Sequence, residues 1–298
     1  MKHRHIGFAV AIALCLGLRP TQAWHLDGHR LMATAAIEAL PEHVPMFLRK
    51  GAKAIAHSTI DPDLYRHRGL PELRSHEGPE HYFDRELFPA TTLPATRYAF
   101  LKQCFDVDIN PENVGLLPYA IVEWTQRLTI ALAEHRQWPS NAYVQHKCLF
   151  YAGILSHYAA DLCQPLHTTV HYDGRVRADG KSPRSGIHLK VDDLFRRVEL
   201  DWEQLCAGMV LQSMDVLMVE VLAELERSHS LVDRVYALEA KLPVPEQPWV
   251  ADQQVTDLAH IRARTAARFI GNLILTAWDR SAGLELPSWL DRGVLDAE

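Results

Sequence analysis

The sequence lacks the signatures of several large protein classes. After residue 23 it has no hydrophobic run long enough to cross a bilayer, and it has no internal repeat or low-complexity tract. No stretch alternates apolar and polar residues between hairpin signals, which argues against a β-sheet protein. It also lacks a nucleophile-elbow glycine pattern and a phosphate-cradling Gly-Lys loop, so neither a serine nucleophile nor P-loop chemistry is indicated.

The chain also lacks an excess of positive charge and has few cysteines. Its formal net charge is -6 at pH 7, which argues against broad electrostatic binding of nucleic-acid backbones or anionic membranes. A polyanionic substrate would therefore have to be held locally, by metal. Of the five cysteines, Cys15 lies in the segment described next, leaving Cys104, Cys148, Cys163 and Cys206. An even number permits disulfides, but four cysteines allow three pairings, and buried thiols are an equal alternative.

Residues 1–23 have the pattern of a secretory signal peptide, with a basic start, an apolar core and a small residue before the cleavage point. Cleavage after Ala23 would make Trp24 the new N-terminus, whose free amine and carbonyl oxygen can chelate a metal. We therefore expect an exported protein, periplasmic or extracellular, whose mature domain spans residues 24–298. Loss of Lys2, Arg4 and Arg19 would make the mature chain more acidic still.

Helical periodicity dominates this mature segment, and 48% hydrophobic residues suffice for one substantial core. Apolar residues recur at three- and four-residue spacing in six stretches: 29–40, 118–136, 141–162, 187–200, 202–227 and 252–279. Polar loops with Gly and Pro are expected at 57–95 and 168–186, and a proline-rich connection at 240–251. The sequence thus predicts one all-α, multi-helix domain.

The most informative motif is His157-x-x-x-Asp161, followed by Pro165 and His167. Four residues make about one helical turn, so His157 and Asp161 project from one face, and the proline ends the helix and turns His167 back toward them. Two imidazoles and a carboxylate are zinc ligands by type. A second His-x-x-x-Asp pair follows at His188 and Asp192. Either pair alone is compatible with a solvated helix face, but both together favour metal.

The order of motifs along the chain resembles the trinuclear-zinc phosphodiesterases. This superfamily comprises the single-strand-specific nucleases (3′-nucleotidases) of fungi and plants and the bacterial zinc-dependent phospholipases C. The resemblance covers residues 24 to about 195, and beyond them the match is only helical. It rests on these fragments: Trp24-x4-His29, Asp63-x-x-Arg66, His81-Tyr82-Phe83-Asp84, the segment HYAADLCQPLH that contains His157, Asp161 and His167, and His188-x-x-x-Asp192.

The resemblance implies three zinc ions per chain. The first would be held by Asp63, His81, His157 and Asp161. The second would be held by the Trp24 amine and carbonyl, His29 and a bridging Asp161, and the third by His167, His188 and Asp192. Reasoning from spacing alone reaches only the His157, Asp161 and His167 group and the His188 and Asp192 pair.

Three further residues receive candidate roles. Asp61 and Asp63 flank Pro62 and either could face inward; Asp63 is preferred because Arg66 follows three residues later, as in the family. Arg66 could bind phosphoryl oxygens with its fork of donors, or be an ordinary surface arginine. Tyr82 occupies the position where the related nucleases stack a base, although core packing is an equal alternative.

We therefore expect hydrolysis of a phosphoester by zinc-activated water, without a nucleophilic side chain and without an obligate protein partner, in a monomer. The Trp24 to His29 step, the Asp63 and Arg66 pairing and an aspartate at 192 favour single-stranded nucleic acid and 3′-nucleotides as substrates. The loop 168–186 lacks the Gly-Gly-Asn-like stretch of those nucleases, however, and Asp193 adds negative charge. A phospholipase C acting on headgroups is the alternative, and a non-catalytic zinc carrier is a third reading.

Overall fold

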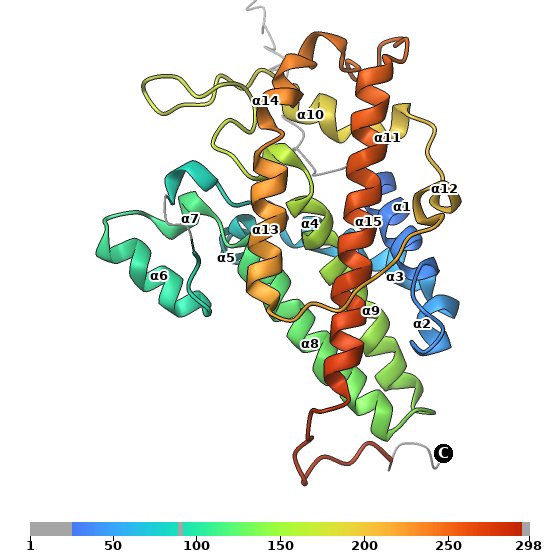
Figure 1. Ribbon diagram of the computed structural model, residues 1–298. Coiled ribbons are helices and arrows are strands. Elements are labelled where there is room, and N and C mark those ends of the chain that lie inside the picture. Colours follow the sequence, from blue (N-terminus) through green and yellow to red (C-terminus); the bar gives the residue numbers. More distant parts are fainter. Residues whose placement is uncertain (1–25, 89–91, 294–298) are drawn as a thin grey trace, which may run out of the picture.

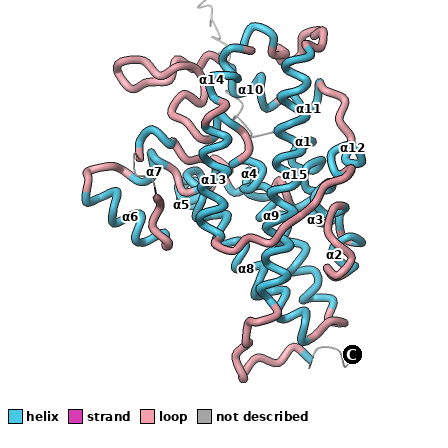
Figure 2. Tube along the Cα trace, in the orientation of Figure 1, coloured by secondary structure: helices cyan, strands magenta, loops and turns pink. Residues whose placement is uncertain are grey.

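Four helices pack together at the centre of the molecule (Figure 1): α1 (Leu26–Glu38), α8 (Leu117–Gln137), α9 (Ala142–Leu162) and α15 (Gln253–Ser281). Side-chain caps start two of them. Asn141 accepts hydrogen bonds from the backbone of residues 143 and 144, and Asp252 does the same at α15. The computed structural model describes residues 26–88 and 92–293. These residues form one all-α domain without β-strands (Figure 2), as the sequence predicts.

The C-terminal half of α9 runs through the core. Every residue from Ala152 to Leu162 is buried, so polar and apolar side chains alike are shielded from solvent. A helix that is buried on all sides needs apolar residues on all sides. Here His157 and Asp161 interrupt that apolar surface. Burying two ionisable groups is costly unless each meets a partner, so their surroundings must supply charge, hydrogen bonds or metal.

The prediction of a loop over residues 57–95 is largely wrong, because much of this segment folds into short helices. Prolines 62, 71 and 79 occupy first-turn positions, where the missing N–H has no intrahelical partner to lose and the fixed φ suits a helix start. The elements of this part are α2 (Met46–Lys50), α3 (Ala52–Ser58), α4 (Asp61–Tyr65), α5 (Pro71–Glu77), η1 (Gly78–His81), η2 (Arg85–Leu87), α6 (Arg97–Asp106) and α7 (Pro111–Val114).

Two predicted helices in the second half are shorter than expected. The helix predicted over 187–200 breaks at Asp193, and the one over 202–227 is interrupted after Cys206, where Gly208 takes a left-handed φ of 62°. The helical spacing of apolar residues continues across both breaks, so the breaks cannot be predicted from that spacing. The elements are η3 (Pro165–His167), α10 (Ile187–Asp192), α11 (Leu194–Arg197), α12 (Trp202–Cys206), α13 (Leu217–His229), α14 (Val232–Ala237) and η4 (Glu239–Lys241).

Other expectations meet mixed outcomes. The segment 168–186 contains no helix, as predicted, and the connection before α15 is irregular after η4. Cys104, Cys148, Cys163 and Cys206 are all free thiols, so none of the possible pairings is present. None of the described helices has the length and apolar character needed to span a bilayer. The signal peptide and Trp24 lie outside the described residues.

Candidate metal centre

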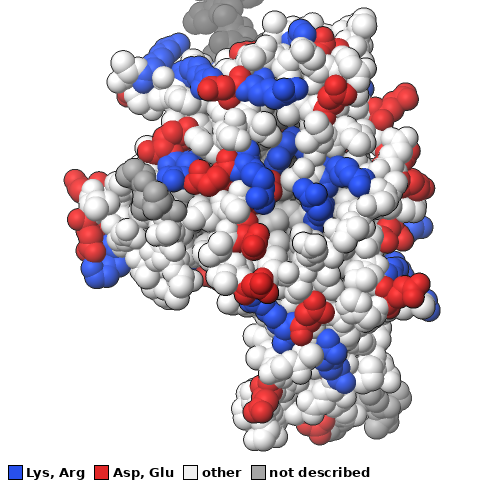
Figure 3. Space-filling view, viewed as in Figure 1, with Lys and Arg blue, Asp and Glu red and all other residues white. Residues whose placement is uncertain are grey.

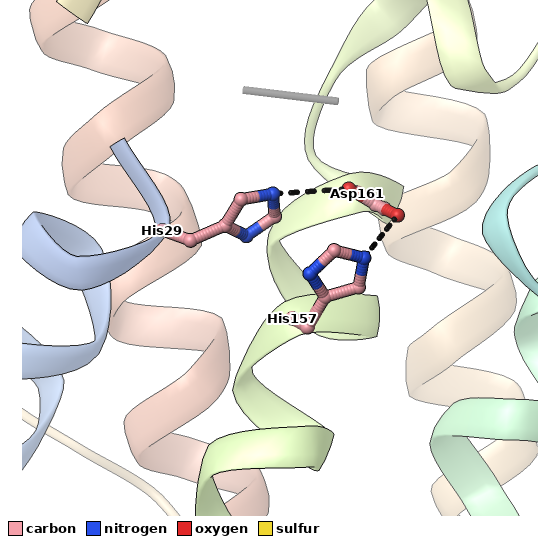
Figure 4. Close-up of side chains that lie close together, drawn as sticks. All are labelled: His29, His157 and Asp161. Atoms are coloured by element: carbon pink, nitrogen blue, oxygen red, sulfur yellow. Dashed lines mark ion pairs between the residues drawn. The ribbon is translucent and has the colours of Figure 1, made fainter. Parts of the chain in front are cut away.

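Asp161 is the focus of the buried polar cluster. Its Oδ2 lies 3.2 Å from Nε2 of His157, one turn earlier on α9, and its Oδ1 lies 3.5 Å from Nε2 of His29 on α1. Figure 4 shows one carboxylate oxygen facing each imidazole, and the two imidazole rings stack on each other with centroids 4.3 Å apart. All three side chains are fully buried. Ligand atoms from these three residues lie within 4.8 Å of one another, close enough to share an ion.

His81 and Asp63 form a second group with His157. Nδ1 of His81 lies 3.0 Å from Oδ2 of Asp161 and 3.0 Å from Nε2 of His157. The carboxylate of Asp63 completes a set of ligand atoms within 4.8 Å, and its buried Oδ2 has no hydrogen-bond partner. Asp61 belongs to none of the groups among the described residues. Of the two candidate aspartates, the structure therefore brings Asp63 to the histidines.

His167, His188 and Asp192 form a third group of the same size. Nε2 of His188 lies 3.3 Å from Oδ2 of Asp192, one turn later on α10. The amide of Gln164 donates to the other oxygen of Asp192 at 3.1 Å. Nε2 of His167 is buried and makes no hydrogen bond. The two motifs that the sequence analysis identified by spacing thus meet in space.

Backbone carbonyls orient three of the imidazoles. A carbonyl only accepts, so it fixes Nδ1 as a protonated nitrogen and leaves Nε2 facing the cluster as the nitrogen that can coordinate metal. The pairs are His157 with Thr59 at 2.7 Å, His167 with His81 at 2.7 Å and His188 with Tyr172 at 3.2 Å. Histidines that ligate metals show this arrangement. These carbonyl partners cannot be predicted from the sequence, because tertiary packing selects them.

His81 is oriented by a carboxylate instead. Its Nε2 lies 3.4 Å from Oε1 of Glu77, which is buried and also accepts a hydrogen bond from the hydroxyl of Tyr158. Burial alone would raise the pKa of Glu77, but its interactions with His81 and Tyr158 outweigh burial and lower it. An anionic Glu77 therefore holds His81 with Nδ1 toward Asp161. Glu77 was not among the residues predicted from the sequence, although its four-residue separation from His81 was a possible signal.

The electrostatics differ between the groups. Burial would lower the pKa of His157, but the charge of Asp161 outweighs burial and raises it to about 9. Burial would raise the pKa of Asp161, and His157 and His167 hold it well below its ordinary value. In the third group burial lowers the pKa of His167, while burial and the neighbouring His167 lower that of His188 to about 3.

The donor set fits zinc. Each group mixes imidazole nitrogen with carboxylate oxygen, the usual zinc ligands, and all the side chains converge from different elements into one buried cluster. Buried atoms without hydrogen bonds, at Asp63 Oδ2 and His167 Nε2, are costly in a protein without metal and are satisfied by coordination. The arrangement therefore supports divalent metal at these positions. The contribution expected from Trp24 stays a prediction.

A cavity of about 750 Å³ opens onto the cluster, within the size range of small-molecule sites. The side chains of His81, His167 and His188 reach it. Arg66 also lines it and forms an ion pair with Oδ1 of Asp63 at 3.3 Å. The other lining residues are Tyr82, Asp84, Leu87, Asn113, Leu166, Val170, Tyr172, Val176, Gly180 and Ser182.

Tyr82 is part of the cavity wall rather than of the core. Its hydroxyl donates to the carbonyl of Glu112 at 2.5 Å, and burial raises its pKa to about 12. Gly115, with a φ of 93°, packs against the Tyr82 backbone so closely that a Cβ there would lie 2.0 Å from the carbonyl oxygen. Only glycine allows this approach. The ring of Tyr82 is therefore held in a fixed position beside the cluster.

Comparisons with known proteins give little beyond the fold. No protein-family model matches the chain, and no curated protein does. Among solved structures, the chain is similar to that of Clostridium perfringens alpha-toxin isolated from avian strain SWCP. That similarity has a TM-score of 0.41 and 11% sequence identity, and it covers 89% of this chain and 67% of the toxin chain. So distant a likeness carries no argument about activity, which has to come from the side chains.

Proposed function

We propose that this protein is an exported zinc-dependent phosphoester hydrolase that cleaves single-stranded nucleic acid and 3′-nucleotides. The observation that carries the proposal is the presence of three groups of zinc-type ligands, two of them joined through His157, beside a cavity that His81, His167 and His188 line. Bound zinc would lower the pKa of water toward neutrality and polarise phosphoryl oxygens. Clustered divalent ions of this kind suit phosphoester cleavage, and no nucleophilic side chain is required.

The chain's own residues would hold the substrate. Arg66 lines the cavity and is only partly exposed, and among the described residues it forms an ion pair only with Asp63. A guanidinium has five N–H donors, so donors are left for phosphate oxygens beside the ligands. Leu166 and Val170 also line the cavity and would exclude water from the reacting group.

Tyr82 supports a nucleotide over other phosphoesters. Its ring is fixed by Glu112 and Gly115 and forms part of the wall, where a base could stack on it. Tyr172 also lines the cavity and is 38% exposed. Stacking of an unpaired base on an aromatic ring contributes about 1–3 kcal/mol and needs no basic groove.

Phospholipase C activity is the second candidate. The favouring observation is apolar surface near the cavity: Leu64, Leu70 and Leu73 are exposed on the chain segment that carries Arg66, and Leu87 lines the cavity itself. Exposed leucines of this kind can contact lipid. A zinc carrier without catalysis is the third candidate.

Metal analysis combined with a substrate panel tests the proposal. The mature protein should carry about three zinc ions and hydrolyse single-stranded DNA, RNA and a 3′-nucleotide, with activity lost on chelation and restored by zinc. Turnover of phosphatidylcholine alone would move the assignment to phospholipase C. Bound zinc without any turnover would favour the carrier. N-terminal sequencing should find Trp24 first, and any other start would remove the second zinc set as proposed.

Tyr82→Ala tests the nucleotide assignment directly. Loss of stacking should reduce kcat/KM on single-stranded DNA by about tenfold, in the range expected for one stacked base. Hydrolysis of phosphatidylcholine or of a small aryl phosphodiester should change far less. Equal losses on all substrates would mean that Tyr82 only maintains the shape of the wall.

A further inference from the structure

The segment 174–186, which we term the basic arm, concentrates positive charge in an otherwise acidic protein. It contains four exposed basic residues and one acid, Asp179. Arg175 is paired with Asp233 and lies 4.0 Å from the ring centre of Tyr236, so it anchors the arm to α14. The other three basic residues, Arg177, Lys181 and Arg184, form no ion pair with any residue that the structure describes.

The basic arm is a built turn. The backbone N–H of Arg177 donates to the carbonyl of Lys181 at 3.1 Å, and that of Gly180 donates to the carbonyl of Arg177 at 2.9 Å. Gly180 adopts a φ of 75°, which suits glycine. Asp179 caps the N–H of Lys181 with its carboxylate at 3.1 Å. The turn therefore holds the two cations Arg177 and Lys181 side by side at the tip.

The arm lies at the edge of the cavity. Val176, Gly180 and Ser182 all line it, so the cations neighbour the opening that leads to the metal ligands. In Figure 1 the arm projects from the upper left of the molecule, and Figure 3 shows Lys and Arg side chains gathered there. Ser182 further ties the arm to the body, since its hydroxyl donates to the carbonyl of Asp173 at 2.8 Å.

Unpaired cations at a cavity edge fit a substrate with several negative charges that extends beyond the site. A single-stranded nucleic acid has phosphates on both sides of the bond that is cut. An anionic membrane fits less well, because none of the large hydrophobic side chains exposed in the described structure lies in 174–186. A membrane-docking loop usually combines basic and apolar residues.

We propose that the basic arm binds the phosphate backbone of single-stranded nucleic acid next to the scissile bond. This inference rests on the proposed nuclease function and adds to it the contact that distinguishes a polymer from a mononucleotide. Local charge of this kind is compatible with a net charge of -6, because salt screens the distant acidic residues within about 10 Å. The overall charge had argued against such binding only across the surface as a whole.

The test compares two triple variants. The arm variant carries Arg177→Gln, Lys181→Gln and Arg184→Gln. The control carries Lys50→Gln, Lys53→Gln and Arg268→Gln, which remove three exposed cations of α2, α3 and α15 that line no part of the cavity. Two measurements are made on the zinc-loaded protein: kcat/KM on a thymidine oligonucleotide and on bis(p-nitrophenyl) phosphate, and binding of a phosphorothioate oligonucleotide by fluorescence anisotropy over a range of salt.

The arm variant should lose about tenfold in oligonucleotide affinity near physiological salt, and its plot of log K against log salt should flatten by about 2, at about 0.7 for each lost phosphate contact. Hydrolysis of bis(p-nitrophenyl) phosphate should be unchanged, and the control variant should match the wild type. Equal effects in both variants, or an unchanged salt slope, would overturn the proposal. So would an arm variant that binds the oligonucleotide normally but loses binding to phosphatidylserine vesicles. Absence of turnover in the wild type would contradict the nuclease function, while the anisotropy measurement would still decide the role of the arm.

Discussion

The two halves of the ligand cluster use the same His-x-x-x-Asp spacing but handle charge in opposite ways. In the half built on α9, the carboxylate of Asp161 lies within 3.8 Å of four imidazoles: His29, His81, His157 and His167. In the half built on α10, Asp192 lies 3.3 Å from the imidazole of His188 and accepts a hydrogen bond from the uncharged amide of Gln164. The first arrangement raises the pKa of His157 to about 9, and the second leaves that of His188 at about 3.

This difference shows that spacing selects the ligands, while the balance between burial and neighbouring charge sets their protonation. Without metal, the α9 half keeps a proton on His157 at neutral pH, and zinc has to displace it. The α10 half already holds a neutral imidazole with a lone pair available to metal. The two halves should therefore differ in how zinc binding depends on pH and on single substitutions.

The largest effect should follow Asp161→Asn. The amide cannot serve both groups as an anionic ligand, so zinc should be lost from both α9 groups while the third group keeps its ion. Activity should fall on the order of a thousandfold, because several kcal/mol of transition-state stabilisation would be lost. Elemental analysis and turnover measure both, and Asp192→Asn is the matched control that should cost only one ion. Retention of all the zinc by Asp161→Asn would contradict the shared role of this carboxylate.

Stability against pH should separate the halves next. The pKa of His157 is raised from 6.5 to about 9 on folding, so its contribution to the free energy of unfolding is full below pH 6.5 and is lost as pH rises through 9. His188 is neutral in both the folded and the unfolded protein above pH 6.5, so it adds no pH dependence to the free energy of unfolding between pH 6.5 and 9. The chelator-treated protein should therefore lose a few kcal/mol between these pH values.

Urea unfolding at several pH values checks this expectation. Zinc-loaded protein should not show the loss, because a ligating His157 is already unprotonated. His157→Gln should remove the pH dependence from the metal-free protein. A metal-free wild type whose stability is constant across the window would contradict a protonated His157 beside Asp161.

The sequence predicted the parts of this centre that depend on local spacing. His157 and Asp161, like His188 and Asp192, are one turn apart, and helical geometry alone puts each pair on one face. His29, Asp63 and His81 came only from resemblance, because they lie on other elements and reach the cluster through tertiary packing. The all-α class followed from periodicity, whereas the break at Asp193 did not, because apolar spacing continues through it.

Residues that act through a partner were beyond the sequence analysis. Nothing in the local pattern links Gln164 to Asp192 or the carbonyl of Thr59 to His157, and both contacts exist only after α9 has packed. The short helices of 57–95 were missed for another reason. The prolines in this segment favour the prediction of a loop, although proline also favours the first turn of a helix.

The smallest of the effects considered should follow Glu77→Gln, which changes a partner of His81 and no ligand. Glu77 is buried, lies 3.4 Å from Nε2 of His81 and accepts from Tyr158. Removing its charge should weaken the hold on His81 and lower zinc affinity at the α9 half by about 10–100-fold, the range for orienting carboxylates. The α10 half, whose imidazoles are oriented by backbone carbonyls, should be unaffected.

Titration of the metal-free protein against a chromophoric chelator resolves the ions by affinity. In Glu77→Gln one zinc ion should bind more weakly, while the affinity of the zinc site in the α10 half should stay at the wild-type value. Tyr158→Phe is the matched control, because it removes the hydrogen bond that Tyr158 donates to Glu77 and keeps the charge of Glu77. Its effect on zinc affinity should therefore be smaller. A uniform weakening of every ion in Glu77→Gln would mean that Glu77 supports the packing around α9 as a whole, and the contrast between carboxylate-oriented and carbonyl-oriented histidines would then have no energetic meaning.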